Sequence, residues 1–164
     1  VTLIFACGTD YKMELPNFRG EDPHKAVTAR INAAAKKGYE ALKADHVADH
    51  DALFSRVELG FDEEIPQIPT DELIKKYRNM IENNGGDIPT SAEQRALEIM
   101  CYQFGRYLTI AGSRDGALPT NLQGVWGEGW FTWYGDYHFN INVQMNYWPT
   151  MASNLSECTE TSRS

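Results

Sequence analysis

The stretch ALEIMCYQFGRYLTIAG, Ala96 to Gly112, is the longest helical pattern in the chain. Thr90 and Glu93 precede it with the spacing of a capping box, and Gly112 ends it. A helix of about 20 residues, roughly 30 Å long, is therefore predicted here. Its apolar side chains recur three and four positions apart, at Leu97, Cys101, Phe104, Leu108 and Ala111.

Three further helices are predicted upstream. Asp22 and Pro23 supply an N-cap and a first helical residue for a helix that Gly38 ends. A second helix follows from about Tyr39 to Phe54, and a third from Asp71 to about Glu82. The chain is therefore expected to be mainly α-helical.

Two short segments are predicted to be strands. Val1 to Cys7 is apolar and β-branched, which is typical of a buried strand. Arg56 to Phe61 alternates apolar and polar side chains, which is typical of a half-buried one.

Composition excludes several classes of partner. The 164 residues carry a formal net charge of -8 and contain no run rich in Lys and Arg. Nucleic acid and anionic membrane surfaces are therefore poor partners. No apolar run approaches the ~20 residues of a membrane span. The cysteines, three in number and without CxxC spacing, are expected to be buried free thiols.

The segment YHFNINVQMNYWP, Tyr137 to Pro149, suggests a ligand site. Its neutral hydrogen-bonding side chains alternate with apolar ones, so an extended segment would place the polar ones on one face. Carboxamides donate and accept hydrogen bonds, which suits a hydroxyl-rich ligand. Loop amides bonded to the backbone are the alternative. The four side chains concerned are His138, Asn140, Asn142 and Gln144.

All four tryptophans fall close to that segment, at Trp126, Trp130, Trp133 and Trp148. Aromatic walls with a few polar groups are typical of a small-molecule site, and sugar rings stack on such walls. A Trp-rich lid that packs on its own helices explains the same composition.

Charged catalytic groups are less evident. Glycoside hydrolysis usually needs two carboxyl groups, and none of the nearby acids has a compelling setting: Glu128, Asp136, Glu157 and Glu160. His46 and His50 are spaced as a possible metal pair, but no third ligand stands out, and no metal site is predicted.

Several motifs resemble one family closely. LPTNLQGVW (118–126), YHFNINVQMNYWP (137–149) and NLSEC (154–158) are similar to the signature of glycoside hydrolase family 95, the α-L-fucosidases with α-L-galactosidase relatives. FGRYLTIAGSRDGALP (104–119) and, more weakly, HVADHDALFSRVEL (46–59) extend the resemblance upstream. The family usually has a longer loop with Pro-Pro-Trp where this chain has GEGWFTWYGD (127–136), which leaves the leaving-group sugar open.

That resemblance implies an architecture. Residues 1–61 would be the tail of an N-terminal β-sandwich with two helices, and 62–86 a helical linker. Residues 87–164 would be the first helices and active-site loop of an (α/α)6 toroid, with the rest of the toroid beyond Ser164. The exposed helix faces of such a piece would favour self-association.

It also implies a reaction. Family members hydrolyse terminal α-(1,2)-linked L-fucose from glycans with inversion and without a metal or organic cofactor. By this match His138 binds sugar hydroxyls, with Trp126, Trp133 and Trp148 around the substrate, while Asn140 and Asn142 orient the attacking water.

The same match places the base Asp and the general-acid Glu downstream, so the chain alone is expected to be inactive. A secreted, periplasmic or cell-surface bacterial location follows from the family's glycan substrates. A non-catalytic carbohydrate-binding module is the alternative function, since it would use the same tryptophans and amides for recognition only.

Overall fold

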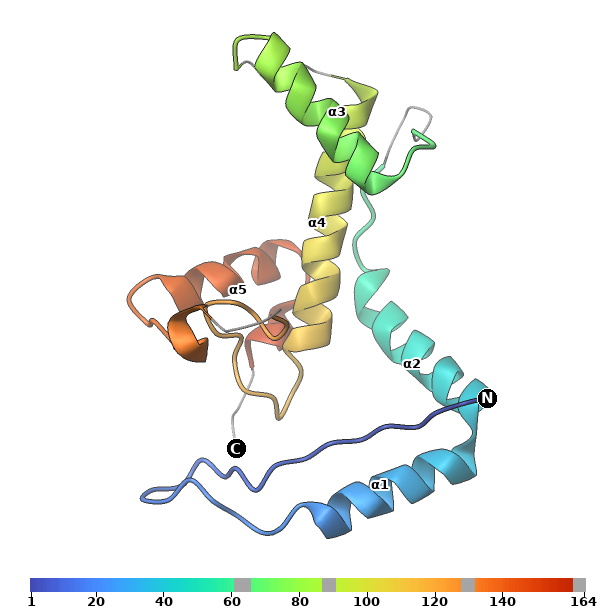
Figure 1. Cartoon of the computed structure of the whole chain (residues 1–164), viewed down its shortest axis with the longest axis vertical. Coiled ribbons are helices and arrows are strands. Elements are labelled where there is room, and N and C mark those ends of the chain that lie inside the picture. Colours follow the sequence, from blue (N-terminus) through green and yellow to red (C-terminus); the bar gives the residue numbers. More distant parts are fainter. Residues whose placement is uncertain (61–65, 87–90, 128–131, 161–164) are drawn as a thin grey trace. The chain divides into compact units, whose positions relative to one another are not determined.

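The structure of the chain, a computed structural model, describes residues 1–60, 66–86, 91–127 and 132–160. Within these ranges the regular elements are α-helices and two short 3-10 helices, as expected of a mainly α chain (Figure 1). The chain divides into two compact units, Val1–Asp51 and Ala52–Ser164. Both predicted domain boundaries, after residues 61 and 86, border segments outside the described residues and stay predictions.

The first unit opens with a tight reversal of the chain. Tyr11 and Arg19 form an isolated antiparallel bridge. The rings of Tyr11 and Phe18 stack with centroids 6.4 Å apart, and the Arg19 guanidinium lies 2.6 Å from the Asp10 carboxylate. These contacts close the reversal locally.

Helix α2 has the predicted bounds, and α1 begins one residue later than predicted, with Pro23 as its N-cap residue. The Asp22 carboxylate accepts the backbone N–H of His24 at 2.8 Å, at the start of α1 (His24–Lys37). Gly38 ends α1 at a φ of 81°, a left-handed value that glycine adopts without strain. Helix α2 (Tyr39–Phe54) begins at the next residue.

The second unit contains the remaining elements. Helix α3 (Thr70–Asn83) buries Leu73 and half-buries Tyr77, as its spacing predicts. Helix α4 (Ala92–Gly112) is capped by Ser91, whose Oγ accepts the N–H of Gln94 at 3.1 Å. The predicted capping residue, Thr90, lies outside the described residues. Among the described helices none has the length and apolarity to cross a bilayer. In chain order the elements are α3 (Thr70–Asn83), α4 (Ala92–Gly112), η1 (Thr132–Gly135), α5 (Asn142–Ala152) and η2 (Ser156–Thr159).

Neither predicted strand is formed within the described residues. Val1, Leu3 and Phe5 are exposed, and residues 56–60 are irregular; Phe61 lies outside the described residues. A strand persists only where a neighbour accepts its backbone hydrogen bonds, and no described segment pairs with either stretch. The apolar patterns of these two segments are compatible with strands, but such a pattern alone does not establish that a sheet forms.

The core of the second unit is small and is built around the end of α2. Leu53, Ile110, Leu155 and Cys158 form a buried cluster, against which Phe54 packs. Burial raises the pKa of the Cys158 thiol. Cys7 and Cys101 are exposed, so burial of the thiols is confirmed only for Cys158.

Arg106 of α4 is buried beside this cluster, with 2% of its surface exposed. Its guanidinium donates to the backbone carbonyls of Leu53 at 3.1 Å, Phe54 at 2.8 Å and Val57 at 3.1 Å. It also lies 5.1 Å from the centre of the Phe54 ring. The last carbonyls of a helix have no partner within the helix, so Arg106 caps α2 from another element.

The apolar stripe of α4 identified in the sequence is largely exposed. Phe104 and Leu108 expose 58% and 36% of their surface, while α4 buries Ala96, Arg106 and Ile110 instead. Phe104 and Tyr107 stack at 6.0 Å between ring centroids. An exposed apolar stripe of this kind favours association, and self-association of the chain stays a prediction.

Replacement of Arg106 by Met tests the cap. Met keeps much of the length of the side chain but leaves the α2 carbonyls without their donors. We expect the free energy of unfolding in urea to fall by about 3 kcal/mol, because several hydrogen bonds are lost together. The control Arg30→Met, at an exposed position of α1, should change it by less than about 0.5 kcal/mol. Equal effects of the two substitutions would contradict a capping role.

An ion pair joins α3 to α4 and makes stability depend on pH. The hydrogen bond from the Lys76 ammonium, above all, holds the pKa of the Glu93 carboxyl below its usual value. A lowered folded-state pKa stabilises the fold above the ordinary carboxyl range, and this contribution is lost as pH falls through that lowered pKa. The difference in Tm between wild type and Glu93→Gln should therefore shrink from about pH 7 to about pH 3. Circular dichroism melts at low salt measure it, and Glu21→Gln, at an exposed site, should show no such trend; a constant difference for Glu93→Gln would refute the coupling.

Candidate active-site segment

The segment from Tyr137 to Pro149 is not extended. Residues 139–141 form a turn, and α5 begins at Asn142. Val143 donates its N–H to the carbonyl of His138 at 3.1 Å, and Met145 donates to Ile141 at 2.9 Å. Successive helical residues turn by about 100°, so positions two apart point to nearly opposite sides.

The predicted single polar face is therefore wrong. Asn142 and Gln144 lie about 200° apart around α5, and the Gln144 amide donates to the carbonyl of Phe139. Phe139 and Ile141, expected to back the polar face, are exposed at 66% and 41%. No described strand pairs with the segment, which satisfies its backbone groups locally by forming a helix.

His138 lies beside the carboxylate of Asp136 and the indole of Trp133. Its Nε2 is 3.9 Å from an Asp136 carboxylate oxygen, and its ring meets Trp133 edge-on with centroids 6.2 Å apart. Trp133 sits in η1 with a φ of 63° and exposes 60% of its surface. An imidazole, an indole and a carboxylate are thus brought together at a solvent-exposed position.

The side chains of Asn140 and Asn142 have hydrogen-bonding groups that the described part of the chain does not use. Asn140 is exposed in the turn, and Asn142 is half-buried at the first position of α5. Neither carboxamide makes a hydrogen bond to any described residue, in contrast to the backbone-bonded alternative. Each can accept a hydrogen bond from water or from a sugar hydroxyl through its carbonyl oxygen and can donate one through its nitrogen.

The three described tryptophans lie in different surroundings. Trp126 lines a pocket with α5, Trp133 contacts His138, and Trp148 lies on α5 with 63% of its surface exposed. Trp148 is about 120° around the helix from Asn142. Trp130 lies outside the described residues, as does Glu128.

The segment 118–126 is held against α5 by hydrogen bonds that the sequence did not predict. The Tyr147 hydroxyl accepts the N–H of Thr120 at 2.9 Å and pairs with the Ser113 hydroxyl at 2.9 Å. The Asn146 amide donates to the carbonyls of Thr120 and Asn121, at 3.4 and 3.1 Å. Because Ser113 is the C-terminal residue flanking α4, Tyr147 ties α4, α5 and the 118–126 segment together.

Further contacts fix the same segment from its other side. Tyr137 donates its hydroxyl to the carbonyl of Pro119 at 2.7 Å, and Leu122 donates its N–H to the carbonyl of Asp136 at 3.2 Å. A Cβ at Gly112 would lie 3.1 Å from a Val125 methyl carbon, so a side chain at residue 112 would require Val125 to shift by a few tenths of an ångström.

Two pockets flank α5. The first, which we name the Trp126 pocket, has a volume of about 240 Å³. Its lining comes from the end of α4, the 118–126 segment and α5: Leu108, Thr109, Ser113, Thr120, Gln123, Gly124, Val125, Trp126, Asn146 and Tyr147.

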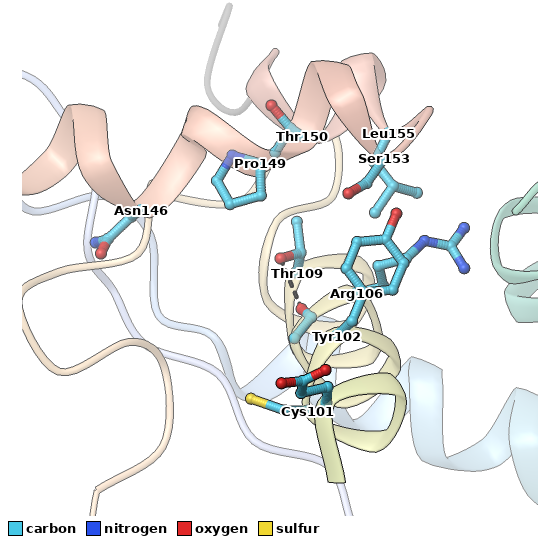
Figure 2. Close-up of a pocket in the computed structure, with 11 residues that line it drawn as sticks. Cys101, Tyr102, Arg106, Thr109, Asn146, Pro149, Thr150, Ser153 and Leu155 are labelled. Atoms are coloured by element: carbon cyan, nitrogen blue, oxygen red, sulfur yellow. Dashed lines mark hydrogen bonds between the residues drawn. The ribbon is translucent and has the colours of Figure 1, made fainter. Parts of the chain in front are cut away.

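The second pocket, the α4–α5 groove, has a volume of about 550 Å³. Figure 2 shows residues of α4 facing residues of α5 and its C-terminal end across this groove, with Asn146 at one end and Leu155 toward the other. Thr109 and Asn146 line both pockets. The groove is mostly apolar and includes Glu98 and Arg106, whereas none of the described residues that line the Trp126 pocket is charged.

His46 and His50 lie on α2 with ring centroids 6.5 Å apart. In the described part of the chain, no group of three or more His, Cys, Asp or Glu side chains is arranged to hold a metal ion.

Comparison with known proteins gives a consistent result. Residues 38–163 match the family model described as the glycosyl hydrolase family 95 catalytic domain. "Probable alpha-fucosidase A" of Aspergillus niger is 38% identical over 98% of this chain and 20% of its own length. "Alpha-L-fucosidase 2" of Arabidopsis thaliana is 36% identical over 85% of this chain and 16% of its own length. The chain thus spans about a fifth of the length of these curated relatives.

Substitution of Tyr147 by Phe tests the link between α5 and the 118–126 segment. The ring stays, but the N–H of Thr120 and the hydroxyl of Ser113 lose their partner. We expect the free energy of unfolding in urea to fall by about 1–2 kcal/mol. Tyr134→Phe is the matched control, because Tyr134 is 88% exposed, and should change it by less than about 0.5 kcal/mol. A Tyr147→Phe variant as stable as the wild type would show that the hydroxyl does not hold the segment.

Proposed function

Because this chain belongs to glycosyl hydrolase family 95, we propose that it is part of an inverting α-L-fucosidase that releases terminal α-(1,2)-linked L-fucose from glycans. The similar proteins are named as α-fucosidases of fungi and a plant, which supports this substrate class. An α-L-galactoside is the closest alternative substrate. In the same proposal the helices from α4 onward begin an (α/α)6 toroid, and the enzyme acts outside the cell or in the periplasm.

The main support for the proposal is that the carboxamides of Asn140 and Asn142, close to His138 in the sequence, make no hydrogen bond to any described residue. Hydrolysis with inversion needs a water held on the face of the sugar opposite the leaving group. A carboxamide oxygen can hold that water, but it has no useful proton affinity near neutral pH, so a carboxylate must take the proton. In this proposal the two amides orient the water and His138 binds sugar hydroxyls.

Both catalytic carboxyl groups are proposed to come from the rest of the enzyme. Inverting glycosidases place the acid and the base about 6.5–9.5 Å apart across the substrate. The Asp136 carboxylate lies 3.9 Å from His138, and its side chain is 60% exposed. The lining of the Trp126 pocket includes no carboxylate from the described residues. The chain alone is therefore expected to bind sugar weakly and to catalyse nothing.

One observation favours the alternative, a carbohydrate-binding module without activity. Trp126, Trp133 and Trp148 are all more than half exposed, as the aromatic residues of a recognition surface would be. In such a module the amides would contact sugar hydroxyls and no water would be activated.

Turnover of 2′-fucosyllactose separates these functions. The full-length gene product should release fucose first as the β-anomer, which proton NMR detects before mutarotation. Asn142→Ala in that protein should lower kcat by at least about a hundredfold, because the water loses its orientation. Asn79→Ala, at an exposed position of α3, is the control and should leave kcat unchanged. Binding of the trisaccharide without turnover would instead establish the module, and release of the α-anomer would refute inversion.

A further inference from the structure

The Trp126 pocket has the composition of a site for one neutral, hydroxyl-bearing ring. Its volume of about 240 Å³ is below the range typical of drug-sized ligands, so it suits a single ring. Among residues 91–127 and 132–160, no charged side chain lines it, and such a lining disfavours phosphates and acidic sugars. Its lining combines hydroxyl and carboxamide groups with apolar side chains, and one of its lining residues, Trp126, is 55% exposed.

Gln123 supplies an acceptor that the protein does not use. Its side-chain Oε1 is enclosed and has no hydrogen-bond partner in the described part of the chain. An enclosed carbonyl oxygen without a donor is unfavourable. The terminal torsion of glutamine is broad, so rotation of the carboxamide can turn Oε1 toward the pocket. A ligand hydroxyl could then donate to it without breaking an existing bond.

The position of the pocket relates it to the candidate active-site segment. Asn146 lines the pocket, and Asn142 lies four residues earlier on the same face of α5. One helical turn separates the two by about 6 Å along the helix axis, a step comparable to the length of one sugar ring. The hydrogen bonds of Tyr147 and Asn146 to the 118–126 segment hold Gln123 and Trp126 in place relative to that face.

We propose that the Trp126 pocket is a subsite for the sugar that carries the fucose, the leaving-group sugar, with Gln123 as its hydrogen-bonding residue and Trp126 as its stacking surface. This inference rests on the proposed function, since it assigns the ring next to the one bound at His138, Asn140 and Asn142. A neutral pyranose such as galactose has the size, the hydroxyls and the apolar ring face that this lining would recognise.

Two substrates of the full-length gene product separate this subsite from the fucose site. In 2′-fucosyllactose the leaving group is a disaccharide, and in α-L-fucosyl fluoride it is a single atom that fills no subsite. We expect Gln123→Leu to raise KM for 2′-fucosyllactose about tenfold with kcat within about twofold, because it removes binding made equally in ground and transition states. For the fluoride, kcat/KM should stay within about twofold of the wild-type value.

Gln123→Glu keeps the shape of the side chain, so it controls for a folding defect in Gln123→Leu. It should likewise raise KM for 2′-fucosyllactose and leave kcat/KM for the fluoride unchanged. Leu118→Ala is the matched control, since Leu118 lies on the same segment outside the pocket lining, and should affect neither substrate. Unchanged kinetics for both Gln123 variants would overturn the subsite, and an equal loss for both substrates would assign Gln123 to the fucose site instead. A wild-type protein that cleaves neither substrate would refute the proposed function itself.

Discussion

The end of helix α2 depends on one buried cation. Three consecutive or near-consecutive carbonyls, of Leu53, Phe54 and Val57, face the guanidinium of Arg106. Each would be costly to bury without a donor, and a buried guanidinium would be costly without acceptors. The two terminal nitrogens of Arg106 meet both requirements, while its buried Nε has no partner in the described part of the chain, and the positive charge also suits the negative end of a helix. This mutual compensation fixes where α2 stops and which face of α4 is buried.

Packing of the small core follows from that contact. With the end of α2 held on α4, Leu53 joins Ile110 in the buried cluster, and Leu155 and Cys158 complete it. Arg56 lies just beyond the same helix end and pairs with Glu157 at 2.6 Å, while its Nε donates to the carbonyl of Ala52. The chain after α5 is therefore attached to the end of α2 by both apolar and ionic contacts.

The candidate active site is connected to this core through the end of α4. Ile110 is in the core, and Ser113, three residues later, pairs with the hydroxyl of Tyr147. Pro149 would weaken α5 by removing one backbone donor, and Thr150 adds a side-chain donor nearby, to the carbonyl of Tyr147 at 2.6 Å. Helix α5 fixes the spacing between Asn142 and Asn146. Sites carried on helices are more precise than sites on loops.

Local signals made the helices predictable, and the absence of local signals explains the failures. Asp22, Gly38 and the spacing of Leu73 and Tyr77 act within one or two turns, so the sequence alone indicates them correctly. The strand at Val1–Cys7 required a partner, which no local pattern can supply. Arg106 was unremarkable in the sequence, because its acceptors are about fifty residues away.

The site was predictable in its chemistry but not in its geometry. Alternation of polar and apolar residues at Tyr137–Pro149 fits a strand and also fits a turn followed by a helix, where side chains two apart diverge. What survives the change is the identity of the groups: His138 beside Trp133, and two carboxamides that bind nothing else in the described structure. The helix adds a relation that the strand interpretation could not contain. Asn142 and Asn146 lie four residues apart and share a face of α5, and Asn146 lines the Trp126 pocket. Polar groups one helical turn apart can serve neighbouring rings of one ligand, whereas a strand would have placed alternate residues in a single row.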